Sequence, residues 1–362
     1  MLPPRIVRRL LLAPLLLAFT VAALVTLPPL VLVAVAVSPW LPGRWRALRL
    51  LWLALVWLVL ESAALIACLG LWIASGFGDR LRSERFLERH YAILRWFLDT
   101  VFRAATRVFR LRIEVEEPEL TARELASRGT RPVIVLSRHA GPGDSFLLVH
   151  RLLADYQRRP RVVLKAMLQL DPGLDVVINR LPHAFVNARK AGAGRVLAEI
   201  ERLAADLGPR DALVIFPEGG NFTPRRRARA IERLERQHRT EQAARARAMR
   251  NLMPPHTGGA LTAIAAAPTA DVIFVAHTGL EDLVTIGDIW RSMPMEQVLK
   301  ARWWRVEAVE VPEGRDAQVR WLYDWWAQID RWIAENRPVP LPRRTAGLGG
   351  RKRSGPSVGS ER

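Results

Sequence analysis

Two long hydrophobic runs near the N-terminus constrain the possible fold most strongly. Residues 10–43 carry no charged side chain, and residues 50–78 carry only one. A helix needs about 20 apolar residues to cross the hydrocarbon core of a bilayer, so each run is long enough to span one. The pattern predicts a membrane-anchoring helical hairpin over residues 1–79.

Prolines interrupt the first of these runs, at Pro14, Pro28 and Pro29. Proline removes a helical hydrogen bond, so this run is expected to be kinked or re-entrant. A cleaved signal peptide over residues 1–36 is an alternative, because arginines precede the run and small residues lie near its end. The second hydrophobic run follows at once and favours the hairpin.

Basic residues flank the hairpin and predict its orientation. By the positive-inside rule, both flanks face the cytoplasm, and so does the domain that follows. Arginines in the short connection at residues 44–49 weaken this prediction, unless the hairpin is shallow and never reaches the far side. Glu61 is costly inside lipid, so it is either a functional carboxylate or, as we favour, a neutral or interfacial one. The flanking arginines are Arg5, Arg8 and Arg9 before the first run and Arg80, Arg82, Arg85 and Arg89 after the second.

The whole chain is strongly basic. Its formal net charge is +19, and almost all of the basic residues are arginine. Such an excess indicates an anionic partner, which is a nucleic acid, an anionic membrane surface or a phosphorylated substrate. The single cysteine, Cys68, excludes an intrachain disulfide and any multi-cysteine metal site.

Helical periodicity marks two further segments. Over residues 81–110, apolar residues recur at helical spacing among arginines, which is typical of a helix at the lipid interface and equally of one packed on a globular domain. The tryptophan-rich residues 315–336 leave the same two alternatives. Residues 341–362 are rich in Gly, Ser, Pro and Arg, and we expect a disordered basic tail.

Between these segments, short β-like runs alternate with helix-like stretches. This alternation predicts an α/β catalytic domain over residues 80–340, in which a mixed, mostly buried sheet is flanked by helices. The helices are expected near residues 145–159, 192–206 and 225–251. The apolar runs that predict strands are residues 111–117, 133–136, 162–164, 184–186, 213–216 and 272–275.

A histidine and an aspartate follow the second of these strands. His139 lies in a loop with Gly141 and Gly143, and Asp144 comes just before a predicted helix. A neutral imidazole suits removal of a hydroxyl proton near pH 7, and a carboxylate on its other ring nitrogen would fix the tautomer. The glycines allow the loop to bend so that the two side chains meet. Alone, such a pair is more often structural than catalytic.

A second glycine-rich loop follows the strand predicted at residues 213–216. It reads Phe-Pro-Glu-Gly-Gly over residues 216–220 and leads into the arginine-rich helix. Free backbone N–H groups at a helix N-terminus, beside Arg225, Arg226 and Arg227, can hold a phosphate. A solvated arginine face is the alternative.

In this order, the motifs resemble those of the glycerol-phosphate and lysophospholipid acyltransferase family, which includes 1-acylglycerol-3-phosphate acyltransferases. The resemblance covers roughly residues 85–335. The family's His-x-x-x-x-Asp pattern falls on His139 and Asp144, and its Phe-Pro-Glu-Gly-Thr pattern falls on residues 216–220, with Gly in place of Thr. Its Phe-Val-x-Arg pattern resembles residues 185–189, with the arginine one position late, and its apolar stretch ending in Pro resembles residues 252–255.

The resemblance implies a role for each matching residue. His139 would be the general base and Asp144 its orienting partner. Arg189 would bind the acceptor phosphate, although Arg138, which stands with Ser137 where the family has Asn, or Lys190 would be alternatives. The implied substrate-binding residues are Arg138, Arg189, Phe216, Pro217, Glu218, Gly219 and Gly220.

The resemblance also implies a function. A membrane-bound enzyme would move a fatty acyl group from acyl-CoA or acyl carrier protein to a lysophospholipid hydroxyl, first of all that of 1-acyl-sn-glycerol-3-phosphate, to give phosphatidic acid. No metal, bound cofactor or nucleic acid would take part. The alternatives are another lysolipid or glycolipid acceptor, an inactive scaffold of the same family, and a non-catalytic basic protein that binds membranes or nucleic acid. No nucleic-acid-binding module is recognisable.

Overall fold

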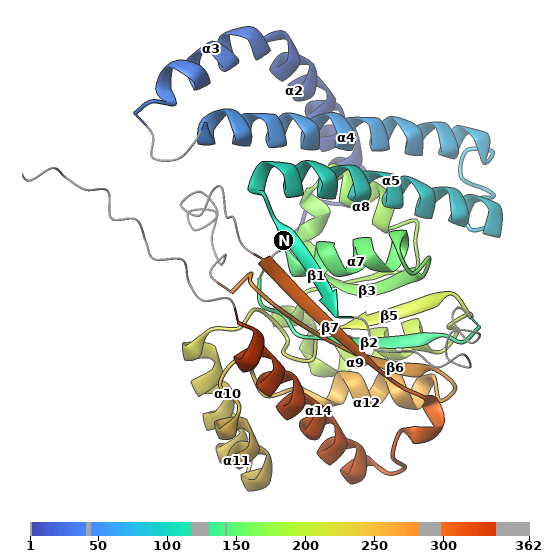
Figure 1. Ribbon diagram of the computed structural model, residues 1–362. Coiled ribbons are helices and arrows are strands. Elements are labelled where there is room, and N and C mark those ends of the chain that lie inside the picture. The colour runs from blue at the N-terminus through green and yellow to red at the C-terminus, as the bar shows by residue number, and fades with distance from the viewer. Residues whose placement is uncertain (1, 41–44, 117–129, 142, 282–297, 338–362) are drawn as a thin grey trace, which may run out of the picture.

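The protein is an α/β fold with a helical hairpin above it (Figure 1). The structure is a computed structural model and describes residues 2–40, 45–116, 130–141, 143–281 and 298–337. Within them, a mixed seven-stranded sheet is covered by helices on both faces. The predicted fold class is therefore confirmed.

The sheet has the order β1-β7-β6-β2-β5-β3-β4. All neighbouring strands run parallel except β6 and β7, which are antiparallel. Every apolar run that predicted a strand forms one, and β7 is an additional strand that the pattern did not indicate. The bounds are β1 (Arg112–Glu116), β2 (Val133–Ser137), β3 (Arg159–Lys165), β4 (Ala184–Val186), β5 (Asp211–Ile215), β6 (Asp271–Thr278) and β7 (Val298–Val306).

Helices α5 (Glu84–Phe109), α7 (Asp144–Ala154) and α8 (Pro172–Ile178) lie above the sheet in Figure 1. Helix α7 packs against α5 and β3, and its Leu152 belongs to the same apolar cluster as Val133 and Val135 of β2. The amphipathic α5 lies between α4 and α7, with Tyr91 and Leu94 buried. Of the two alternatives for this segment, the structure therefore supports packing on a globular domain.

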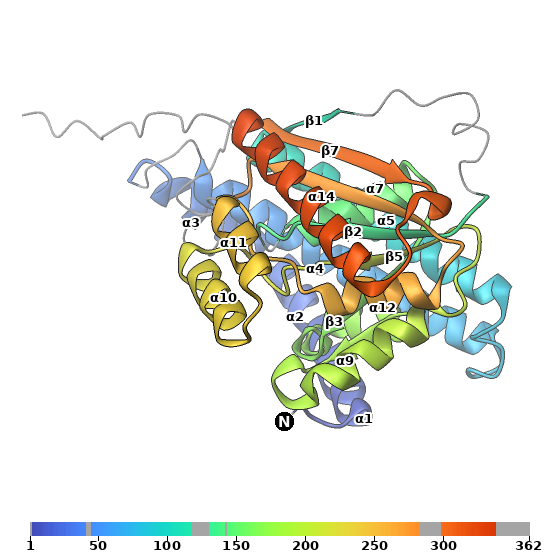
Figure 2. The ribbon, with the colours of Figure 1, turned by 90° about the horizontal axis from the view of Figure 1, so that it is seen from below.

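The opposite face is covered by α9 (Ala188–Ala204), α12 (Thr257–Ala266) and α14 (Arg315–Asn336), as Figure 2 shows. The tryptophan-rich helix is α14, and it packs on the core: Trp326 is fully buried and Trp325 stacks on Phe274 at 4.6 Å. The arginine-rich segment forms two helices, α10 (Pro224–Arg236) and α11 (Thr240–Ala248). Short helical turns complete the elements at η2 (Ala166–Leu170) and η3 (Ala308–Glu310).

The N-terminal hairpin bends where its prolines predict. A π-helical turn, η1 (Arg8–Leu12), separates α1 (Arg5–Val7) from α2 (Ala13–Val25), and a break at Thr26 separates α2 from α3 (Leu27–Val37). Both bends lie just before a proline, which cannot donate the next helical hydrogen bond. The second arm is one continuous helix, α4 (Arg46–Ala74). By length and composition, residues Arg5–Val25 and Arg46–Ala74 are each able to cross a membrane.

Polar contacts join the hairpin to the α/β domain. Arg8 forms a buried ion pair with Asp175 of α8 at 2.7 Å. Glu61, in the middle of α4, accepts the N–H of Gly173 at 3.0 Å, and Arg180 donates to the carbonyl of Cys68 at 2.7 Å. Glu61 thus has a packing role at the interface between α4 and α8. The tail predicted at residues 341–362 lies outside the described residues.

Candidate active site

His139 and Asp144 meet at the carboxyl end of β2. The Nδ1 atom of His139 lies 3.0 Å from both carboxylate oxygens of Asp144. Asp144 is the first residue of α7, where the helix dipole favours a negative charge. The Asp144 side chain is 2% exposed and that of His139 is 14% exposed, so the imidazole is the partner that solvent can reach. Because Nδ1 is taken by Asp144, Nε2 is left to act on a ligand.

The loop backbone holds the Asp144 carboxylate in place. Its Oδ2 atom accepts the N–H groups of Ala140 at 2.7 Å and Gly141 at 3.1 Å, and Ser145 Oγ lies 3.3 Å from Oδ1. Burial on its own raises the pKa of Asp144, but the hydrogen bond from His139, the nearby His277 ring and the Gly141 N–H together lower it. Asp144 is therefore an anion that orients His139 and can stabilise its protonated form.

The buried side chain of Glu218 connects its own loop to the loops of His139 and Met253. One carboxyl oxygen accepts the N–H of His139 at 2.8 Å, and the other accepts the N–H of Met253 at 3.0 Å. The residue is 1% exposed, and burial raises its pKa to about 7 against the opposing effect of Arg138. We predicted Glu218 as a substrate-binding residue. In the structure both of its oxygens accept backbone N–H groups, so Glu218 holds the loops behind His139 together.

Arg138 is also turned into the protein. It is 1% exposed, pairs with Glu281 at 2.6 Å and donates to the carbonyls of His277 and Asn251. Burial raises the pKa of Glu281, but Arg138 outweighs this and lowers it to about 2, so the pair is fully charged near neutral pH. The charge that Arg138 was expected to offer to a phosphate is therefore neutralised inside the protein.

The other predicted substrate-binding residues lie around His139 with different exposures. The centre of the Phe216 ring lies 4.7 Å from that of the His139 ring. The carbonyl of the buried Pro217 accepts the backbone N–H of His256 at 2.7 Å. Gly219 and Gly220 have φ values of +66° and +153°, which explains the glycines in this turn. Residues 189 and 190 lie in the first turn of α9, but the side chains of Arg189 and Lys190 lie outside the described part of the structure.

Three basic side chains gather over the Gly219–Gly220 turn. The Arg226 guanidinium occupies the space that a Cβ at position 220 would need, and it donates to the Asn221 carbonyl at 2.8 Å. Arg233 lies 3.3 Å from Nε2 of His256. Within the described residues, no carboxylate pairs with Arg226 or Arg233, and no acceptor is bonded to the backbone N–H of Gly220. We call Arg226, Arg233 and His256 the basic cluster.

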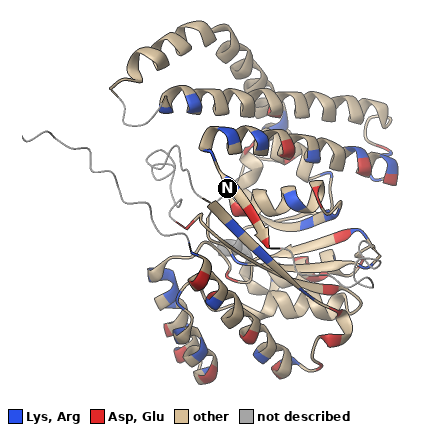
Figure 3. Ribbon diagram, in the orientation of Figure 1, with Lys and Arg blue, Asp and Glu red and all other residues tan. Residues whose placement is uncertain are grey.

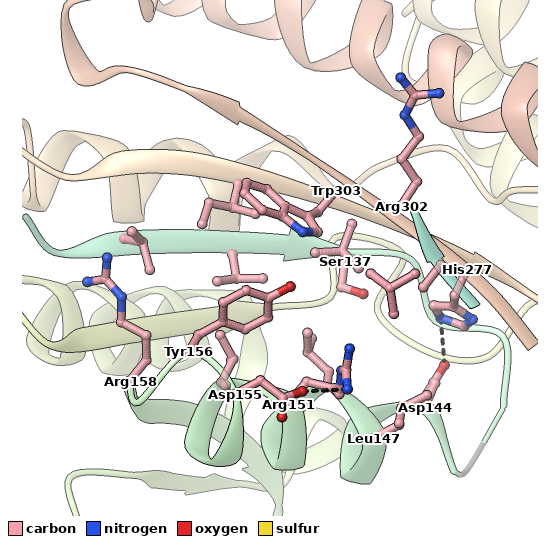
Figure 4. Close-up of a pocket in the computed structure, with 18 of the residues that line it drawn as sticks. Ser137, Asp144, Leu147, Arg151, Asp155, Tyr156, Arg158, His277, Arg302 and Trp303 are labelled. Carbon is pink, nitrogen blue, oxygen red and sulfur yellow. Dashed lines mark ion pairs between the residues drawn. The ribbon is translucent and has the colours of Figure 1, made fainter. Parts of the chain in front are cut away.

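An apolar cavity of about 450 Å³ lies between α7 and the sheet. Its walls include Val133 and Val135 of β2, Ile273 and Val275 of β6, and Leu148 of α7. In Figure 4, Asp144 and His277 lie at one end and Arg158 lies at the other, with Ser137 and Tyr156 between them. The cavity thus starts beside the carboxylate of the His139–Asp144 pair and continues between α7 and the sheet.

His277 is a residue of this site that the sequence analysis did not identify. It lies on β6, and its Nε2 atom is 3.6 Å from Oδ2 of Asp144. A histidine that ends the apolar run of residues 272–276 is a weak signal, because most such residues are structural.

One comparison with known proteins bears on this site. The family model described as Acyltransferase matches residues 112–280, which run from β1 to the end of β6. The match contains His139, Asp144, the Gly219–Gly220 turn and the basic cluster. No curated protein matches the chain.

Proposed function

Because residues 112–280 belong to the acyltransferase family of glycerol-phosphate and lysophospholipid acyltransferases, we propose that the protein transfers a fatty acyl group from a thioester to a lysophospholipid. The donor is acyl-CoA or acyl carrier protein, and the acceptor that we expect is 1-acyl-sn-glycerol-3-phosphate. The observation that carries this proposal is the His139–Asp144 pair at the carboxyl end of β2, beside an apolar cavity.

The geometry of the pair supports a direct transfer. Nε2 of His139 takes the proton of the acceptor hydroxyl as its oxygen attacks the thioester carbonyl. Asp144 stabilises the imidazolium, which then gives its proton to the departing thiolate. The C–S bond breaks as the new C–O bond forms, and no metal or redox partner is needed. A thioester is reactive enough for positioning and one base to suffice.

The apolar cavity supports the assignment of a fatty acyl substrate. Its volume lies within the range of small-molecule sites, which is about 300–1,000 Å³. Sheet side chains at alternate positions line it, as expected for one face of a sheet. With the thioester carbon beside His139, the hydrocarbon chain would run from Ser137 towards Tyr156, away from water.

The basic cluster supports a phosphate on the acceptor. Two guanidinium groups without a carboxylate partner in the described residues favour a bound anion, and a glycine turn with a free N–H adds a backbone donor. The loop that leads into their helix, α10, contacts the loop of His139, because the Phe222 N–H donates to the His139 carbonyl at 3.0 Å. The acceptor phosphate would therefore lie near the hydroxyl that reacts.

Arg226→Ala and Arg233→Ala test the phosphate assignment. Each should raise KM for lysophosphatidic acid by about 10-fold or more and leave kcat nearly unchanged, because a charge-assisted hydrogen bond contributes about 1.5–3 kcal/mol. Steady-state kinetics with labelled acyl-CoA measure this. Arg225→Ala is the matched control, since it removes the same charge about 100° around the same helix. An equal rise in KM in all three variants would indicate a general electrostatic effect and reject the assignment.

The contacts between the hairpin and the catalytic domain support attachment to a single leaflet. Glu61 and Cys68 lie in the interior of α4, yet they contact Gly173 and Arg180 of the catalytic domain. Helix α5 also lies along α4 (Figure 1). If α4 crossed the bilayer, it would carry these charged neighbours into the hydrocarbon, which is costly. The hairpin would instead lie in the interface on the cytoplasmic side, with its exposed apolar side chains in lipid.

Labelling of Trp40→Cys tests this arrangement. Trp40 is 79% exposed between α3 and α4, so it lies on the far side if the hairpin spans and on the catalytic side if it does not. We expect a membrane-impermeant maleimide to label it from the same side of sealed vesicles as Val309→Cys, an exposed position of the catalytic domain. The native Cys68 is buried and provides a low background. Labelling of the two cysteines from opposite sides would reject the single-leaflet arrangement.

A panel of acceptors tests the proposed function as a whole. Wild-type protein with labelled palmitoyl-CoA is offered lysophosphatidic acid, other lysophospholipids and glycolipids, and the acylated products are separated. We expect the highest rate with lysophosphatidic acid. A higher rate with another lipid would change the acceptor, whereas no product with any of them would favour an inactive scaffold.

A further inference from the structure

The carboxylate of Asp144 faces two imidazoles rather than one. His139 approaches it from the loop after β2, and His277 approaches from β6 with Nε2 at 3.6 Å from Oδ2. This distance is longer than a formed hydrogen bond, but apo active sites often tighten such contacts when a ligand binds. Figure 4 shows His277 and Asp144 facing each other across one end of the cavity.

The surroundings of His277 fix which nitrogen carries the proton. Its Nε2 atom faces two acceptors, the Asp144 carboxylate and the Arg138 carbonyl at 3.4 Å. Its Nδ1 atom is buried and has no hydrogen-bond partner among the described residues. A neutral ring with the proton on Nε2 satisfies both acceptors, whereas the other tautomer would place a lone pair against a carboxylate.

The surroundings of His277 favour this neutral form on balance. Burial and the Arg138 guanidinium lower the pKa of His277 to about 4, against the opposing effects of Asp144 and Glu281. The Arg138–Glu281 pair is internally balanced, and Glu218 is bonded to backbone on the other side of His139. These contacts leave His277 as a neutral donor beside Asp144.

We propose that His277 is a positioning residue that donates a hydrogen bond to Asp144 and thereby sets the basicity of His139. This inference rests on the proposed function, because it takes His139 as the general base. A donor on Asp144 disperses its negative charge, so Asp144 stabilises the His139 imidazolium less. Asp144 is also held by Ala140 and Gly141, so loss of His277 changes the charge that His139 faces rather than the position of the carboxylate.

This arrangement predicts in which direction loss of His277 moves the pH dependence of kcat/KM. Without the His277 donor, Asp144 is a stronger partner for a protonated His139, and the pKa of His139 rises. The fraction of enzyme with a free base then falls at acidic pH and is unchanged at alkaline pH. In His277→Leu, we expect the acid limb of kcat/KM to move up by about half to one pH unit, which is a loss of roughly 3- to 10-fold below that limb.

Two readouts separate this role from a merely structural one. The first is the pH profile of kcat/KM, in which His277→Gln should restore the wild-type limb because its Nε2 donor replaces that of the ring. The second is carbethoxylation of His139 by diethyl pyrocarbonate, followed by mass spectrometry from about pH 5 to pH 8. This reagent modifies the neutral imidazole, so it reports the pKa of His139 without any turnover.

His183→Leu is the matched control. His183 is a neutral histidine that accepts the Val162 N–H at 3.0 Å and touches neither member of the catalytic pair. It should lower stability without moving either profile. A His277→Leu profile that falls equally at every pH, or a limb that moves to lower pH, would overturn the inference. If wild type shows no acyl transfer, the proposed function fails, while the carbethoxylation profiles still decide whether His277 acts on His139.

Discussion

Replacement of His139 by alanine should lower kcat for acyl transfer by about 10²- to 10⁴-fold, the usual contribution of a general base. The variant would lose the Nε2 atom that we propose accepts the hydroxyl proton, since Nδ1 of the native ring is occupied by Asp144. It keeps the backbone N–H that Glu218 accepts, so the loop should retain its conformation. Transfer of labelled palmitate to lysophosphatidic acid in vesicles measures the loss.

His238→Asn is the control for this result. His238 is exposed at the turn between α10 and α11 with a φ of +57°, a conformation that asparagine tolerates well. It should behave as wild type in activity, melting temperature and vesicle binding. His139→Ala should have the same melting temperature and vesicle binding as His238→Asn and should differ from it in activity alone. Retention of more than about one tenth of the wild-type kcat in His139→Ala would reject the general-base mechanism.

The predictions that succeeded depend on local pattern. Strands β2 and β5 are buried on both faces, and such strands appear in the sequence as unbroken apolar runs. Helix α14 has its tryptophans at helical spacing and begins and ends where that spacing does. Strand β7 was missed because Arg302 and Arg305 interrupt its apolar pattern, and its pairing with β6 is the antiparallel one among the described strands.

The predictions that stayed incomplete concern side chains whose partners are distant in sequence. The His139–Asp144 pair could be predicted because both residues share one short loop. Arg138 was assigned to a phosphate because of its position beside His139, but its partner Glu281 comes from the loop after β6. Glu218 joins loops that are separated by long stretches of chain. Only the arrangement of the strands brings such groups together, and the sequence carries no local sign of it.

The residues that line the cavity could not be predicted from the sequence either. They predict how a substitution on β6 would change the preference for acyl-chain length. Residues 273, 275 and 277 alternate on one face of β6 and line the cavity, whereas Phe274 and Ala276 pack in the core on the other face. Ile273 pairs with Val135 and Val275 with Ser137. Ile273 therefore lies about 7 Å further along the cavity than Val275 and Ser137, by the usual rise of a strand.

Ile273→Trp should convert the protein into an enzyme for short acyl chains. The indole would fill the middle of the cavity, where empty space rather than packed core receives it. Displacing about four methylenes of a bound palmitoyl chain costs about 3 kcal/mol, at about 0.8 kcal/mol each. The kcat/KM for palmitoyl-CoA should therefore fall by roughly 100-fold relative to butanoyl-CoA, which ends before the blockage.

The volume-conserving Ile273→Leu is the control, and it should keep the wild-type preference because similar side-chain volumes pack alike. Competition between palmitoyl-CoA and butanoyl-CoA in one reaction measures the ratio directly and cancels differences in the amount of active protein. An unchanged ratio in a folded Ile273→Trp would place the acyl chain elsewhere. A parallel fall for both donors would instead show that the indole disturbs the His139–Asp144 pair, because that pair serves donors of every length.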